Sequence, residues 1–180
     1  MNRTADVVIV GAGVIGSATA FELAKRGYKT LNIDKLPASG YGSTSNSCAI
    51  VRAHYSTWDG VAMAYEGFFY WDDWNKYLEV EDERGMAKYM KTGSIMFMLK
   101  GADHSKKSLN LFKEIGVEHE IWDLETLKKK MPIYSHDSYN GTSRPDEDDS
   151  FFDKSGDQIE GAVWNPGSGY VSDPQLATHN

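Results

Sequence analysis

The chain has 180 residues, of which 41% are hydrophobic and 25% are charged, and its formal net charge is -7 at pH 7. This composition is typical of a globular protein with one domain or one and a half domains. The negative charge argues against a nucleic-acid partner, which needs clustered Lys and Arg, and no apolar run reaches the roughly 20 residues of a membrane span. The single cysteine, Cys48, excludes an internal disulfide and predicts a reducing, cytoplasmic location.

The first elements form a nucleotide-binding pattern. The apolar run Val7 to Val10 predicts a buried parallel strand, and the amphipathic segment Val14 to Lys25 predicts a helix that ends at the next glycine. Between these two elements, Gly11, Gly13 and Gly16 have the G-x-G-x-x-G spacing. Three such glycines are weak evidence alone, but a strand before them and a helix after them are the context that a dinucleotide fingerprint requires.

Each glycine has a distinct expected role. Gly11 permits the tight turn from strand to helix, Gly13 lets a pyrophosphate approach the backbone, and Gly16 lets the helix pack close to the strand. The backbone N–H groups at the start of the helix, which include those of Val14 and Ile15, then bind the phosphates with the help of the helix dipole. The alternative is a turn that the glycines only shape.

A second strand follows the helix. Residues Tyr28 to Asp34 predict a strand with Leu31 and Ile33 directed inward, which completes a right-handed parallel βαβ unit. Asp34 ends this strand. Its separation from the glycines along the chain is close to the roughly 20 residues expected for an acid that binds a ribose hydroxyl. Asp34 and the adjacent Lys35 are therefore candidate cofactor-binding residues.

The pattern changes after the acid. Leu36 to Cys48 is a run of small, hydroxylated and flexible residues, which offers many backbone and hydroxyl donors in one place. Ala49 to Tyr55 then mixes β-branched, cationic and aromatic residues, as the lining of a polar ligand would. The alternative for the first run is a solvated linker.

These segments carry a resemblance to a known family. Asp6 to Asp34, Gly42 to Ser45 and Ile50 to Tyr55 resemble the N-terminal part of the FAD-dependent amino-acid oxidase superfamily. Its members include D-amino acid oxidase, glycine oxidase, sarcosine oxidase and dimethylglycine dehydrogenase, and the sarcosine oxidase branch is the most similar. The resemblance implies that FAD is the cofactor and that the loop from Gly42 wraps its pyrophosphate and ribityl chain. The candidate FAD-binding residues are Gly11, Gly13, Val14, Ile15, Gly16, Asp34, Lys35, Gly42, Ser43, Thr44, Ser45 and Ile50.

The resemblance also implies a substrate site. Arg52 is expected beside the flavin ring, where its guanidinium fork suits the substrate carboxylate. His54 and Tyr55 are further candidates for the pocket. The alternatives are a surface ion pair for Arg52 and packed or exposed aromatic positions for the other two. Ser45 and Ala49 stand where monomeric sarcosine oxidases have a histidine and a second arginine, which leaves the flavin tuning and the exact substrate open.

The remaining elements predict an α+β substrate domain. Residues 61–80 predict one long aromatic helix, followed by a strand at 94–99, a helix at 103–116, a strand at 117–122 and a helix from Asp123 to Lys130. Residues 135–158 are the least ordered by composition, and their acidic cluster at 146–149 predicts a surface loop and no metal site. A strand is expected at 159–164, and Asp173 and Pro174 predict the start of a helix.

The sequence therefore predicts an α/β chain with a Rossmann-like FAD-binding start (1–60), part of a substrate domain (61–166) and a returning helix (167–180). Because that last helix is too short to be stable alone, we expect a fragment of a larger two-domain flavoprotein, or a small subunit that a partner chain completes. The predicted activity is FAD-dependent oxidation of a C–N bond in an amino acid or N-methylated amine. The alternatives are an NAD-dependent dehydrogenase and a non-catalytic nucleotide-binding subunit.

Overall fold

A computed structural model describes residues 4–101, 103–139 and 144–180 of the protein. The chain forms two compact units. The first unit contains the described residues up to Val51, together with Gly67–Lys91 and Gly169–Asn180. The second unit contains Arg52–Glu66 and Thr92–Ser168. None of the helices formed by the described residues has the length and apolar character needed to cross a membrane.

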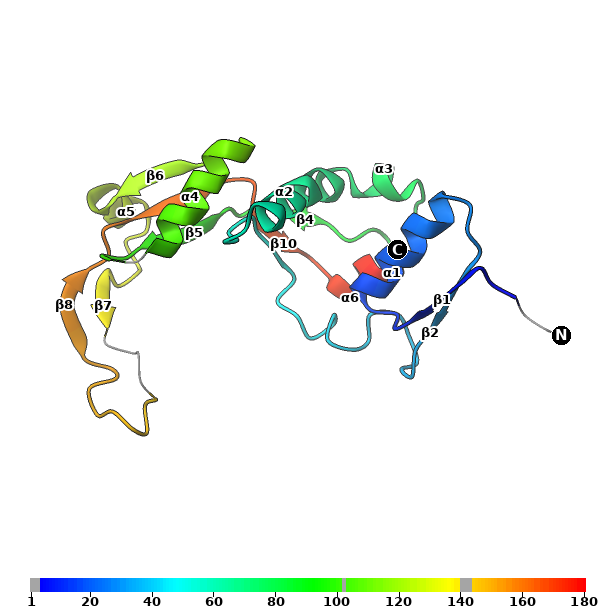
Figure 1. The fold of residues 1–180 in the computed structure, drawn as a ribbon, viewed down its shortest axis with the longest axis horizontal. Helices are drawn as coiled ribbons and strands as arrows, with labels where there is room; N and C mark the ends of the chain where they lie inside the picture. Colours follow the sequence, from blue (N-terminus) through cyan, green and yellow to red (C-terminus); the bar gives the residue numbers. More distant parts are fainter. Residues whose placement is uncertain (1–3, 102, 140–143) are drawn as a thin grey trace. The chain divides into compact units, whose positions relative to one another are not determined.

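The first unit begins with the predicted βαβ unit. Strands β1 (Val7–Val10) and β2 (Thr30–Ile33) pair in parallel, and α1 (Val14–Lys25) connects them (Figure 1). The helix ends as the sequence predicts, because Gly27 has a positive φ of 87° and its N–H donates to the Ala24 carbonyl. The short helix α6 (Pro174–His179), red in Figure 1, packs against α1.

The expected burial of this small sheet is wrong. Val8, Val10, Leu31 and Ile33 are all exposed, Val10 to 88%, whereas the alternate residues of both strands are partly buried. Side chains of a strand alternate between its two faces, and α1 packs against both strands. Ile15, in the first turn of α1, is also 81% exposed. The described residues therefore cover one face of the β1–β2 pair and leave the other face open.

A second sheet of the first unit was not predicted. Strand β10 (Gly169–Val171) lies between β3 (Ile50–Val51) and β4 (Tyr89–Met90), and both pairings are antiparallel. The core beside it contains Ala87, Val171 and Ala177, with partly buried Ala49, Val51, Trp71, Trp74 and Leu176 packed against them. Two of these strands have only two residues, too few for any period to be visible in the sequence.

The single helix predicted over residues 61–80 is also wrong. The segment forms α2 (Trp58–Asp72) and α3 (Trp74–Leu78), separated at Asp73, whose backbone is not helical. Asp favours caps over helix interiors, because its side chain competes for backbone N–H groups. Of the two adjacent phenylalanines of α2, Phe68 is buried but Phe69 is exposed.

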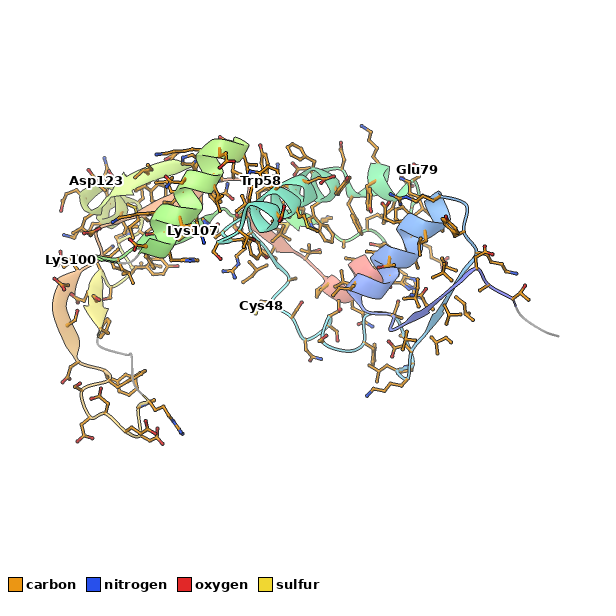
Figure 2. All side chains as sticks on the ribbon, viewed as in Figure 1. Cys48, Trp58, Glu79, Lys100, Lys107 and Asp123 are labelled. Atoms are coloured by element: carbon orange, nitrogen blue, oxygen red, sulfur yellow. The ribbon has the colours of Figure 1, made fainter. Side chains whose placement is uncertain are left out.

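The second unit is built on an antiparallel sheet. Strand β9 (Gly161–Asn165) pairs with β5 (Ser94–Met98) on one side and with β6 (Glu120–Asp123) on the other. Helix α4 (Asp103–Ile115) packs on β5, and α5 (Leu124–Lys130) packs on β6 and β9. Asp123, labelled in Figure 2, caps α5, since its carboxylate accepts the Thr126 N–H at 2.8 Å. One core cluster of this unit contains Trp122, Leu127, Ile159 and Ala162, with Ile95, Phe97, Met131 and Trp164 against it.

Part of the region expected to lack order forms a hairpin. Strands β7 (Asp137–Tyr139) and β8 (Lys154–Gln158) pair antiparallel, and Lys154 forms a 2.6 Å salt bridge with Asp137 across the pair. All five residues of β8 are exposed and most are polar, so no apolar alternation marked this strand in the sequence. The other expected strands and helices of this unit are present with shifted bounds.

Candidate functional site

The glycine turn joins β1 to α1 in the conformation that the fingerprint requires. Gly11 has a φ of 110°, which side chains disfavour, and its N–H donates to the Ile33 carbonyl at 2.8 Å. A Cβ on Gly16 would lie far inside van der Waals contact with the Gly11 carbonyl. Only glycine at that position lets α1 approach the end of β1 this closely.

Asp34 is tied to the glycine turn. Its Oδ2 accepts a 2.7 Å hydrogen bond from the Ala12 N–H, and its Oδ1 accepts a 2.9 Å bond from the Leu36 N–H. These backbone bonds, that from Ala12 first, lower the pKa of the Asp34 carboxyl below its usual range. Asp34 is therefore an exposed carboxylate at neutral pH, beside the turn, and Lys35 next to it is exposed as well.

The hydroxyl-rich loop also meets the start of α1. Thr44 is buried, and its Oγ1 accepts the Val14 N–H at 3.1 Å. The Gly40 N–H donates to the Ala12 carbonyl at 2.7 Å. These contacts anchor the loop to the glycine turn at two points.

The rest of this loop is more open. Ser45 donates through its hydroxyl to the Gly42 carbonyl at 3.0 Å, while Ser43 is exposed and makes no side-chain hydrogen bond to the described residues. Cys48 is exposed near the end of the same loop (Figure 2). Ile50 lies in β3 and is 64% exposed. The candidate FAD-binding residues therefore all lie in the first unit, and most surround the start of α1.

The three candidate substrate residues lie together in the second unit. They line a cavity of about 260 Å³ whose walls contain Arg52, His54, Tyr55, Ser56, Ile95, Met96 and His104. The Arg52 guanidinium carbon lies 5.9 Å from the centre of the Tyr55 ring. No carboxylate of the described residues forms an ion pair with Arg52. Within that part of the chain, the alternative of a structural ion pair has no support.

His54 differs from the other two candidates, Arg52 and Tyr55, because its side chain is buried. Its Nε2 lies 2.8 Å from Ser94 Oγ, and its ring stacks on Phe112 with the centroids 5.1 Å apart. Burial, then the positive charges of Arg52 and His104, lower the pKa of His54 to about 4. The imidazole is therefore neutral at physiological pH, and the positive charge at this cavity comes chiefly from Arg52.

Sequence reasoning missed Ala12, Ser94 and His104. Ser94 is 40 residues from His54 in the chain, and His104 is in the first turn of α4. Only tertiary pairing brings Ser94 to His54 and His104 to the cavity, so no local spacing could have identified them. Ala12 could have been found, since it lies inside the glycine motif itself.

Comparisons with known proteins support the resemblance to the FAD-dependent amino-acid oxidases. A 31% identical relative, a putative sarcosine oxidase of Caenorhabditis elegans, matches 147 residues, which are 81% of this chain and 36% of that protein. The monomeric sarcosine oxidase of Bacillus sp. (strain B-0618) is 29% identical over 149 residues, 81% of this chain and 37% of that protein. The chain thus spans little more than a third of the length of these curated relatives.

Solved structures show the same fold. L-proline dehydrogenase from P. horikoshii matches 99% of this chain and 41% of its own with a TM-score of 0.72 and 22% identity. Glycine oxidase from Geobacillus kaustophilus matches 96% of this chain and 42% of its own, with a TM-score of 0.64 and 22% identity. The predicted α/β fold and the resemblance to amino-acid oxidases are confirmed. The family model of the FAD-dependent oxidoreductases, DAO, matches residues 6–180, and the chain belongs to this family.

Proposed function

We propose that the complete protein is an FAD-dependent oxidoreductase that oxidises the C–N bond of an amino acid or an N-methylated amine, as a sarcosine oxidase does. The observation that carries the proposal is Arg52. Its guanidinium lines a small cavity and lacks a carboxylate partner among the described residues. In the sequence, Arg52 lies in the segment Ile50 to Tyr55, which resembles the FAD-dependent family. A guanidinium of this kind suits a substrate carboxylate, which it binds with two parallel hydrogen bonds.

The residues of the glycine turn fit FAD. Within the described chain, the N–H groups of Gly13, Ile15 and Gly16 have no hydrogen-bond acceptor, which leaves donors at the start of α1 for a pyrophosphate. Asp34 would bind a ribose hydroxyl. Its two oxygens each accept one backbone N–H, and a carboxylate has about four lone-pair sites, so acceptor capacity remains.

The loop would cover the bound cofactor. Gly42, Ser43, Thr44 and Ser45 supply backbone and hydroxyl donors next to the turn, and Lys35 and Ile50 complete the proposed set. When bound, FAD supplies the chemistry: it accepts a hydride equivalent from the carbon next to the substrate nitrogen. The protein must orient that carbon, bind the carboxylate and exclude water.

The cavity around Arg52 suits a small substrate. A volume of about 260 Å³ is just below the usual range of ligand pockets and accommodates a molecule of a few heavy atoms. Ile95 and Met96 give it an apolar side, and Tyr55 contributes an aromatic ring. This lining fits the short carbon skeleton of sarcosine, dimethylglycine or proline.

We further propose that residues outside these 180, from the same chain or a partner, complete the flavin pocket. The support is the length of the relatives, of which this chain matches only 36% and 37%. In the proposed division, residues 1–60 bind FAD, residues 61–166 belong to the substrate domain, and residues 167–180 return to the FAD-binding part. The compact units differ from this division, because residues 52–60 belong to the second unit and residues 67–91 to the first. The free, exposed thiol of Cys48 supports a reducing, cytoplasmic location.

A visible spectrum of the purified complete protein tests the cofactor. We expect flavin absorbance that sarcosine, dimethylglycine, proline or a D-amino acid bleaches without oxygen; a protein that never takes up FAD contradicts the proposal. Arg52→Gln should retain FAD and bind the carboxylate substrate about 100-fold more weakly, since a charge-assisted hydrogen-bonded pair is worth about 1.5–3 kcal/mol. Arg84→Gln, which removes an exposed arginine of the first unit, is the matched control. Equal affinity in the two variants would remove Arg52 from the site.

A further inference from the structure

The short segment that carries Arg52 has no regular secondary structure of its own. Residues 52–55 lie between β3 and α2, and the only backbone hydrogen bond found within them joins the Tyr55 N–H to the Ala53 carbonyl at 2.9 Å. A segment of this kind takes its conformation from the elements it touches. The position of Arg52 at the cavity therefore depends on tertiary anchors.

Two side-chain hydrogen bonds supply these anchors. The His54 ring is hydrogen-bonded to Ser94 at the start of β5, and Ser108 in α4 donates through its hydroxyl to the Tyr55 carbonyl at 2.9 Å. Ser108 is fully buried, as is Phe112, one helical turn later, on which His54 stacks. One strand and one helix of the second unit thus fix the segment from two directions.

The His54 ring itself is poorly placed for chemistry. Its Nδ1 is enclosed by protein and has no hydrogen-bond partner in the described part of the chain, while Nε2 is engaged by Ser94. The nearby groups Arg52 and His104 both oppose protonation of the His54 ring, and no carboxylate of the described residues counteracts their effect on its pKa. The ring therefore directs neither nitrogen to a group of the cavity, and as a neutral imidazole it contributes no charge there.

We infer that His54 is a positioning residue: through its hydrogen bond to Ser94 and its stacking on Phe112, it fixes the backbone between Arg52 and Tyr55 and so orients the Arg52 guanidinium toward the cavity. This inference rests on the proposed function in one respect, since the carboxylate that Arg52 receives is part of that proposal. The anchoring of residues 52–55 does not depend on it. Misplacement of a binding group by about 1 Å can cost roughly 100-fold, so loss of the anchor should be measurable.

The test uses the complete, FAD-loaded protein, the Arg52→Gln variant described above and four further variants. Ser94→Ala removes the hydrogen-bond partner, His54→Leu removes both the bond and the aromatic ring, and His54→Gln places an amide near the position of Nε2 and can restore the bond. Ser105→Ala, at a buried serine of α4 with no hydrogen bond to the segment among the described residues, is the control.

The first readout is hydrogen–deuterium exchange of peptides that cover residues 52–57, without any ligand. We expect Ser94→Ala and His54→Leu to exchange at least 10-fold faster there, with His54→Gln between them and the wild type. Unchanged exchange in both variants overturns the inference, whether or not Arg52 binds a carboxylate.

The second readout is the Kd of acetate, a carboxylate without an amine, from the flavin absorbance change. Ser94→Ala and His54→Leu should raise this Kd about 10-fold, and His54→Gln should recover part of the lost affinity. When Ser94→Ala or His54→Leu is combined with Arg52→Gln, the Kd should be no higher than that of Arg52→Gln alone. Losses that add fully to those of Arg52→Gln contradict action through Arg52. If Arg52→Gln leaves the Kd unchanged, the proposed function fails at this residue, and the exchange result alone decides the anchoring.

Discussion

The backbone N–H of Ala12 donates a 2.7 Å hydrogen bond to the carboxylate of Asp34, which lies 22 residues later in the chain. The bond joins the turn that follows β1 to the residue that follows β2, at the carboxyl ends of two parallel strands. Ligands of open α/β sheets bind at this edge. Asp34 therefore fixes the glycine turn, and in the proposed FAD site it would also present the acceptor for the ribose.

We expect Asp34→Ala to lower FAD affinity by at least 10-fold, because the variant loses the acceptor for the ribose and the bond that fixes the turn. Titration of the apoprotein with FAD, followed by flavin fluorescence, measures the change. Asp6→Ala is a matched control, since Asp6 accepts the Lys29 N–H at 2.8 Å and so makes the same kind of bond at the opposite end of the strand pair. Equal FAD affinity in both variants would rule out a direct role for Asp34.

The second prediction concerns Gly16. Gly16→Ala places a Cβ against the Gly11 carbonyl, and backbone cannot move aside as a flexible side chain can. We expect the variant to bind FAD at least 10-fold more weakly and to be less stable by about 1–3 kcal/mol, the usual cost of overpacking. Urea denaturation and FAD titration measure the two effects.

Gly67→Ala controls for the substitution itself. Gly67 lies in α2 and has open space where a Cβ would be, so alanine there should be neutral or stabilise by up to about 1 kcal/mol. If Gly16→Ala behaves like Gly67→Ala, the close approach of α1 to β1 does not limit this position.

The signals that predicted the fold correctly are local. Gly27 ends α1, Asp123 caps α5 and Asp173 caps α6, each through atoms within three residues. The glycine motif, likewise, contains its own turn geometry. Where a structure depends only on neighbours in the chain, residue type and spacing suffice.

The failures share a different cause. The alternation in β2 shows that two faces exist but not which one α1 covers, so Leu31 and Ile33 were assigned to the wrong face. The β7–β8 hairpin is held by backbone pairing and by the salt bridge of Lys154 with Asp137, neither of which produces an apolar pattern. The cavity around Arg52 could not be predicted for the same reason, because the contact of His54 with Ser94 joins segments that are distant in the chain.

Thr44 gives a third prediction. Its Oγ1 accepts the N–H of Val14 at the start of α1, which makes it a cap supplied from a loop 30 residues away. Thr44→Val keeps the shape but loses the acceptor, and we expect a loss of about 1 kcal/mol in the free energy of unfolding. Thr44→Ser keeps the hydroxyl and should retain most of the stability. Equal stability of the two variants in urea denaturation would show that the cap contributes nothing.

The last prediction is a pH dependence that comes from His54. Its pKa in the folded protein is about 4, below the ordinary value of 6.5 that applies when the chain unfolds. Between these two values the unfolded state binds a proton that the folded state does not, so stability falls as the pH falls from 6.5 towards 4. The groups that face the ring, Arg52, His104, Ser94 and Phe112, include no carboxylate that could reverse the sign.

The size of this effect follows from the two pKa values. At pH 5 the shift should cost the second unit about 2 kcal/mol relative to pH 7.5, where it costs almost nothing. His54→Gln has no group that titrates in this range, so the difference in unfolding free energy between wild type and variant should change by this amount between the two pH values. Urea denaturation at pH 5 and pH 7.5 measures it, and comparison with the variant cancels the titration of the other groups. A difference that stays constant between the two pH values would mean that His54 titrates alike in the folded and unfolded states, and is therefore not enclosed between Ser94 and Phe112.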